Sequence, residues 1–116
     1  MSVPTAPALL DAVAEFLAAI EPKLAGRSAF HAKVAANVLR IVARELVQHP
    51  DVVEAAAYAE LLGPGATAAD VCAQLRDGRL DERTPGLLDA LIAATAARLA
   101  VDNPRYATLA RLTEAR

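Results

Sequence analysis

The chain has 116 residues and a formal net charge of −2, so it offers no basic excess with which to bind a nucleic acid. Its length suits one hydrophobic core, and we expect a single helical domain over residues 1–116. Aromatic residues make up only 3 % of the chain and Ala is its most frequent residue. Because Ala is the best helix former, this composition favours an all-α fold.

The sequence also bears on where the protein resides. No uncharged apolar run approaches the ~20 residues that cross a bilayer, and residues 1–10 lack the basic start of a signal peptide. The single Cys72 has no second cysteine in the chain with which to form a disulfide. We therefore expect a cytoplasmic protein that does not associate with membranes.

The first predicted helix begins at Thr5 as N-cap, tolerates Pro7 in its first turn and runs to about Glu21 or Leu24. Its large apolar residues recur at helical spacing and predict one buried stripe. That stripe consists of Leu9, Val13, Phe16, Leu17, Ile20 and Leu24.

A longer helix is predicted at about residues 27–49, with Ser28 as its candidate cap and Pro50 after its end. Its apolar residues cover about 240° of its circumference, which leaves only a narrow polar strip. Such a helix is expected to be surrounded by others. We therefore expect a compact bundle of five or six helices with residues 27–49 at its centre.

Two shorter helices follow in the sequence. The first opens at Pro50 and ends at Leu62 before Gly63. Thr67 and Asp70 have the spacing of a capping box and start the next one, which Gly78 ends.

Two proline-containing pairs predict the last two helices. Thr84–Pro85 is expected to supply the N-cap and first residue of a helix that reaches about Asp102. Asn103–Pro104 repeats this pattern before a short final helix. The buried stripe expected for the helix that ends at Asp102 is Leu88, Leu91, Ile92, Thr95 and Leu99.

Polar residues interrupt the predicted buried faces at two places. His31 lies within the apolar arc of the long helix, so it is expected to be partly buried, either as a core histidine or as a base or ligand. At the second place, Asn103, Arg105 and Tyr106 extend a buried stripe. They predict either helix caps and packing or a small polar pocket that holds an anion.

Other candidate motifs do not meet their chemical requirements. Residues 63–67 precede a helix but lack the Gly-Lys-Ser/Thr ending of a phosphate loop. The lone cysteine and two histidines are too few for a four-ligand zinc site. The sequence therefore predicts no catalytic residue, no metal site and no cofactor.

Three segments resemble a family of small bacterial proteins with a domain of unknown function: Gly26–Leu46, Leu75–Leu80 and Arg98–Tyr106. The resemblance implies gene neighbours that encode aminoglycoside-phosphotransferase-like kinases and acyl-CoA dehydrogenases, and so an accessory role in acyl-CoA or related catabolism. It transfers no catalytic residue. The polar side chains that its motifs place in this chain are His31, Asn37, Asn103, Arg105 and Tyr106.

Two classes of function follow from these observations. The leading interpretation is a non-catalytic accessory or interaction protein that modulates a kinase-like or acyl-CoA dehydrogenase partner. Self-association is expected too, because Ala-rich faces such as residues 55–57 and 93–94 let helices approach closely. The alternative is an enzyme or a small-ligand binding protein for an anion or an acyl-CoA, with a pocket near His31 and Asn103–Tyr106. We expect a protein without enzymatic activity rather than an enzyme.

Overall fold

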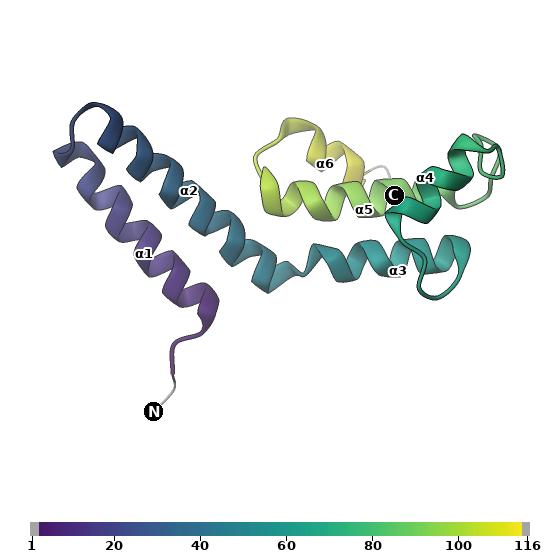
Figure 1. The fold of residues 1–116 in the computed structure, drawn as a ribbon, viewed down its shortest axis with the longest axis horizontal. Coiled ribbons are helices and arrows are strands. Elements are labelled where there is room, and N and C mark those ends of the chain that lie inside the picture. The colour runs from purple at the N-terminus through teal and green to yellow at the C-terminus, as the bar shows by residue number, and fades with distance from the viewer. Residues whose placement is uncertain (1–2, 115–116) are drawn as a thin grey trace. The chain divides into compact units, whose positions relative to one another are not determined.

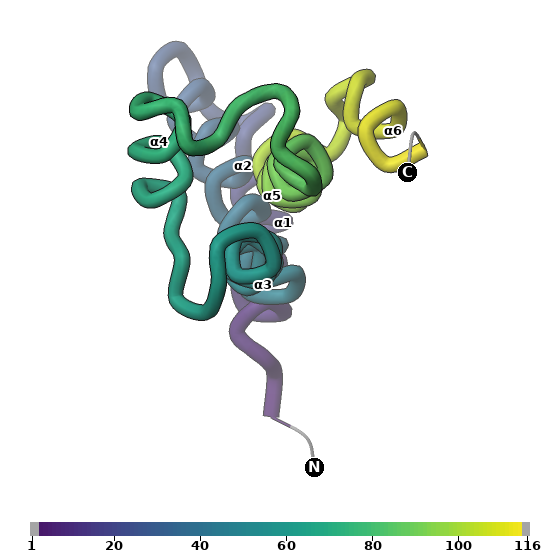
Figure 2. The backbone as a smooth tube through the Cα atoms, turned by 90° about the vertical axis from the view of Figure 1, so that its right-hand side faces the viewer, coloured from purple at the N-terminus to yellow at the C-terminus, as the bar shows by residue number. Residues whose placement is uncertain are grey.

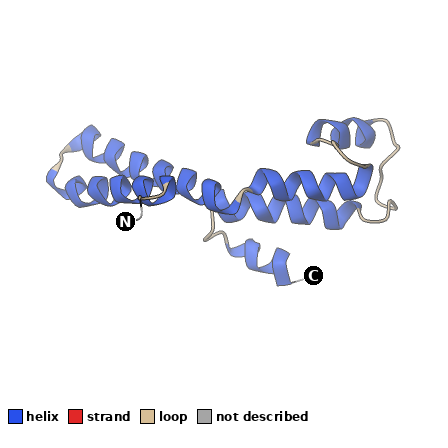
Figure 3. Cartoon of the chain, turned by 90° about the horizontal axis from the view of Figure 1, so that it is seen from below, coloured by secondary structure: helices blue, strands red, loops and turns tan. Residues whose placement is uncertain are grey.

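The computed structural model describes residues 3–114, and that part of the chain contains helices and no strand (Figure 3). The predicted all-α class is therefore confirmed. The elements, labelled in Figure 1, are α1 (Ala6–Ile20), the short 3-10 helix η1 (Glu21–Lys23), α2 (Gly26–Gln48), α3 (Pro50–Leu62), α4 (Ala68–Arg76), α5 (Leu87–Asp102) and α6 (Ala107–Glu114). None of the described helices is both long enough and apolar enough to cross a membrane.

The chain divides into two units, Met1–His49 and Pro50–Arg116, and each is described by itself. The compact bundle around one central helix is not confirmed, because α2 packs within its own unit against α1 and η1. The expectation of one domain stays a prediction.

The first unit is an antiparallel hairpin of α1 and α2 (Figure 1). As predicted, Thr5 is the N-cap of α1, and its Oγ1 accepts a hydrogen bond from the amide of Ala8 at 3.2 Å. The predicted cap of α2 is wrong: this helix begins at Gly26 with Ala25 as N-cap, so Ser28 already lies in its first turn. At its other end, His49 adopts a left-handed conformation with φ of 48°, which ends the helix before Pro50.

Alanines form the contact between the two helices of the hairpin. The buried residues among positions 3–49 are Ala14, Ala32, Ala36 and Ala43. Small side chains let the two backbones approach closely, so the large apolar residues are displaced to the flanks of the contact. The predicted buried stripe of the first helix is therefore partly wrong, because Leu9, Val13 and Phe16 are exposed.

The second unit is built on α3 and α5, which run antiparallel (Figure 1). Seen along these two helices, α4 and α6 lie on different sides of the pair (Figure 2). Its core contains larger side chains than that of the hairpin. They are Tyr58, Val71, Leu80, Leu87 and Ala94, with Leu61, Leu62, Ala66 and Leu91 packed against them.

The predicted start of α5 is wrong. Thr84 belongs to the preceding turn, where its Oγ1 accepts a hydrogen bond from the amide of Asp81 at 3.0 Å. Gly86 is the N-cap instead, with φ of 83°, a left-handed conformation that glycine adopts without strain. The predicted stripe is shifted as well: Leu88 is 69 % exposed and Thr95 is also exposed. The buried residues of α5 are Leu87, Ala90, Ala94 and Val101.

Candidate functional site

The segment between α5 and α6 is a tight turn that redirects the chain. The amide of Asn103 donates to the carbonyl of Leu99 at 2.8 Å, and the amide of Tyr106 donates to the carbonyl of Asn103 at 3.0 Å. Asn103 is therefore the C-cap of α5, and α6 begins only at Ala107. The predicted role of Asn103 as N-cap of the last helix is wrong, because its amide is still used to complete α5.

A cleft of about 850 Å³ lies between α5 and α6. Its walls are mostly apolar, and its only charged lining residue among those described is Arg105, next to Tyr106 at the turn. An apolar cleft with one guanidinium at its end fits an amphiphilic anion or an apolar segment of another protein. The lining residues are Val53, Ile92, Ala93, Ala96, Ala97, Ala100, Pro104, Arg105, Tyr106, Ala107, Leu109, Ala110, Leu112 and Thr113.

The five predicted site residues are divided between the two units. Arg105 and Tyr106 line the cleft, and Tyr106 is 48 % exposed. Asn103 is exposed at the same turn but is not part of the cleft wall. His31 and Asn37 lie on α2 in the first unit.

The expected burial of His31 is wrong. Its side chain is exposed, and its ring centroid lies 5.9 Å from that of Phe30, with the two rings tilted by 54°. Asn37 is exposed as well. The reason is that the apolar arc of α2 is itself largely exposed within the hairpin, so a histidine on that arc faces solvent.

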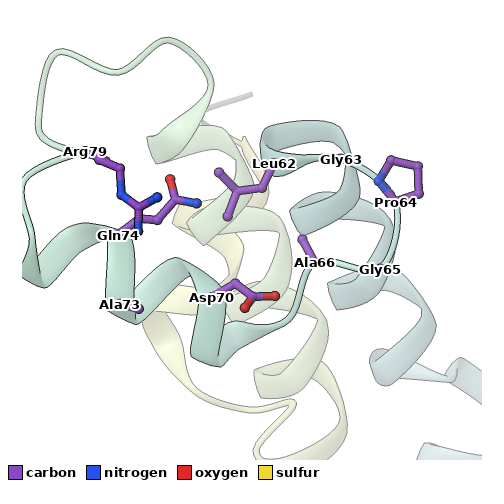
Figure 4. A pocket seen from close by; sticks show the side chains of 9 residues that line it. All are labelled: Leu62, Gly63, Pro64, Gly65, Ala66, Asp70, Ala73, Gln74 and Arg79. Atoms are coloured by element: carbon purple, nitrogen blue, oxygen red, sulfur yellow. The ribbon is translucent and has the colours of Figure 1, made fainter.

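A second, smaller hollow of about 390 Å³ lies at the glycine-rich turn between α3 and α4 (Figure 4). Its carboxylate, Asp70, accepts hydrogen bonds from the amide and Oγ1 of Thr67 at 2.9 and 3.1 Å, which completes the predicted capping box. Its cation, Arg79, pairs with Asp77 at 2.7 Å. Both charged side chains therefore interact with neighbouring residues of the chain. The hollow is explained as the surroundings of a helix start.

Two features common in enzyme sites do not occur among the described residues. None of residues 3–114 is both polar or charged and buried, and no cluster of three or more potential metal ligands occurs among them. The pKa of Tyr58 is raised, chiefly by burial, and hydrogen bonds from Arg79 lower the pKa of Asp77. Each shift has a cause in the local structure, namely burial for Tyr58 and the pair with Arg79 for Asp77.

The side of α2 that faces away from α1 is an exposed apolar surface, which we call the apolar face. At 100° per residue, the centre of this stripe lies about 160° around α2 from Ala36, which is buried against α1. Asp11 and Arg40 line one shallow hollow on a polar flank of the hairpin. The large residues of the apolar face are Phe30, Val34, Val38, Val42 and Leu46.

Sequence reasoning identified these apolar residues but assigned them to the interior of the protein. The signal was available in the broad arc of α2, which exceeds the surface that one partner helix can cover. The sequence predicts a pocket near Asn103–Tyr106 but not the apolar walls of the cleft between α5 and α6, for a different reason. Its walls combine residues of two helices whose angle depends on the turn at residues 103–106.

These observations define a small all-helical protein that exposes apolar surfaces and, within residues 3–114, has no buried charged residue and no cluster of potential metal ligands. The chain belongs to DUF6285, a family described as a domain of unknown function, which matches residues 22–106. The predicted resemblance to a family with a domain of unknown function is thereby confirmed, and the match includes all three segments that carried it. The bacterial source and the gene neighbours expected from that resemblance stay predictions. No curated protein and no solved structure matches the chain.

Proposed function

We propose that this chain is a non-catalytic accessory protein that acts by binding other proteins. The observation that carries the proposal is the apolar face, whose five large side chains are each between 38 and 63 % exposed. An exposed patch of this kind is typical of protein interaction surfaces. Among residues 3–114 no polar or charged residue is buried and no three potential metal ligands cluster.

The partner that we propose is a phosphotransferase-like kinase or an acyl-CoA dehydrogenase. This choice rests on the family resemblance alone. A helical protein without a reactive centre can change the activity of such an enzyme by favouring one conformation of the enzyme. To do so, it must bind that conformation more tightly than the others.

The test is reconstitution with the purified candidate enzymes. We expect the wild-type chain to bind one of them and to change its turnover, and we expect Val38→Glu, at the middle of the apolar face, to weaken this effect. Lys33→Glu places a carboxylate on the polar strip of the same helix and serves as the matched control. Turnover of substrate by the chain alone would contradict the proposal, as would equal effects of the two variants.

A second candidate function is the binding of an amphiphilic anion, such as an acyl-CoA, in the cleft between α5 and α6. The observation that favours it is the combination of apolar walls with Arg105 at the turn. The acyl chain would lie along the alanines of α5, and the guanidinium would pair with a phosphate. Neither His31 nor Asn37 is required.

Thermal stabilisation by acyl-CoAs measures this binding. Arg105→Ala should reduce the stabilisation by removing the anion contact, whereas Arg111→Ala removes an exposed cation of α6 that is not part of the cleft wall. A failure of every acyl-CoA to stabilise the wild-type chain would exclude this second function.

A further inference from the structure

The pair of α3 and α5 carries a long groove on the side where α6 lies (Figure 2). One end of the groove is the cleft between α5 and α6, and the other end is a hollow of about 400 Å³ between α3 and the start of α5. The cleft and the hollow share Val53 and Ala93 as lining residues, so they are continuous. We call the whole the alanine groove, because Ala57 of α3 and Ala93, Ala97 and Ala100 of α5 line it.

The alanine groove has the length of an α-helix of about four turns. From Gly86 to Ala100 it follows α5 for about 21 Å, at 1.5 Å per residue. The alanines of α5 recur at spacings of three and four residues, so they lie on one side of that helix. Small side chains at such positions let a third helix approach to an interaxial distance of about 8 Å.

The walls of the alanine groove favour a helical occupant over an extended one. The backbone amides and carbonyls within α3 and α5 are used inside these helices, so the groove offers an extended peptide no backbone partners. A peptide that enters an apolar groove of this kind must satisfy its own backbone groups. An α-helix does so within its own turns.

Charged side chains give the alanine groove a direction. Glu60 lines the end near Gly86, and Arg105 lines the opposite end. Neither makes an ion pair or a side-chain hydrogen bond with another of the described residues. Asp89 lies at the same end as Glu60 but already has an interaction in the chain. Because α3 and α5 are antiparallel, their dipoles oppose each other, and the polarity of the groove is set by Glu60 and Arg105.

From shape and charge together we infer that the alanine groove binds an amphipathic α-helix of a partner protein, with the N-terminus of that helix at Glu60 and its C-terminus at Arg105. The dipole of the bound helix favours this orientation, since its positive end then lies at the carboxylate and its negative end at the guanidinium. A cation in its first turn and a carboxylate in its last turn would add ion pairs. The inference rests on the proposed function for the view that the chain acts by binding proteins, and it names the segment that is bound. An acyl-CoA in the cleft between α5 and α6 would occupy one end of the groove and exclude the helix.

Selection from a displayed library of helical peptides tests the inference with the full-length chain. Each peptide has about 14 residues and a fixed apolar stripe, and its polar positions in the first and last turns vary between Lys and Glu. We expect the enriched peptides to carry Lys in the first turn and Glu in the last turn more often than the unselected library. Ala93→Leu fills the middle of the groove and should raise the dissociation constant of a labelled enriched peptide by about 10-fold or more. Thr95→Leu adds the same side chain at an exposed position of α5 outside the groove and serves as the matched control.

Charge reversal tests the direction of the bound helix. Glu60→Lys should shift the selected first-turn residues toward Glu, and Arg105→Glu should shift the selected last-turn residues toward Lys. Circular dichroism of each variant separates a loss of binding from unfolding. The inference would be overturned if the wild type enriched no peptide beyond Ala93→Leu, or if neither reversal changed the selected charges.

The same measurements separate the groove from the proposed function. A chain that changes the turnover of an enzyme through the apolar face but enriches no peptide would overturn the groove and leave the proposed function in place. A chain that binds the peptides and changes the turnover of no candidate enzyme would do the reverse.

Discussion

At the scale of single residues, Tyr58 makes the stability of the second unit depend on pH. The side chain is 8 % exposed, and burial is the main cause of its raised pKa, followed by the charges of Glu54 and Cys72. The folded chain therefore holds the phenolic proton at a pH at which the unfolded chain has released it. The associated stability is complete below the unfolded pKa of about 10 and is lost as the pH rises through the folded pKa.

Tyr58→Phe should abolish this part of the alkaline loss of stability. Urea unfolding at neutral pH and above pH 10 would measure the free energy of unfolding of the wild type and of the variant. We expect the wild type to lose stability with rising pH more steeply than Tyr58→Phe does. Tyr106→Phe, at an exposed position, is the control and should retain the wild-type slope; equal slopes for wild type and Tyr58→Phe would contradict the prediction.

At the scale of elements, the start of α4 depends on the reciprocal pair of Thr67 and Asp70. The Oγ1 of Thr67 accepts from the amide of Asp70 at 3.3 Å, and the carboxylate of Asp70 accepts from the amide of Thr67. Thr67→Ala should lower the free energy of unfolding of the second unit by about 1 kcal/mol, because one amide of the first turn loses its acceptor. Chemical denaturation measures this loss. The control Thr95→Ala changes an exposed residue inside α5 and should cost nothing; a loss of equal size there would show that the cap is unimportant.

A comparison of the helix caps shows which helix boundaries can be predicted from the sequence. The caps at Thr5 and Thr67 follow from side chains that bond within three residues, so local pattern is sufficient. The start of α5 could not be read this way, because Thr84 has the same residue type but bonds backward to Asp81, and Gly86 supplies the left-handed residue. Thr84 thus differs from Thr5 and Thr67 in what the preceding turn requires and not in residue type.

The candidate sites show the same division between local and non-local information. Arg105 and Tyr106 were predicted as site residues from their position after a buried stripe, and both line the cleft. The depth of that cleft depends on how α6 packs on α5, which no local pattern encodes. The apolar arc of α2 can also be recognised in the sequence. Such an arc indicates only that this surface of the helix is apolar and is expected to be covered. Whether the same chain or another covers it is not a property of the helix.

For the whole molecule, the two units differ in the source of their stability. The second unit buries Tyr58, Val71, Leu80 and Leu87 within its own core, whereas the described part of the first buries only alanines. A protein that binds the apolar face would therefore add to the stability of the hairpin.

Calorimetry should therefore separate the two units. We expect two transitions, with that of the hairpin at the lower temperature because its buried residues within positions 3–49 are alanines. Ala36→Gly should lower only the first transition by a few °C, because glycine weakens a helix interior, and Thr67→Ala should lower only the second. Val38→Glu changes an exposed residue and should leave both midpoints in place. A single transition that both Ala36→Gly and Thr67→Ala lower equally would mean that the two units unfold together.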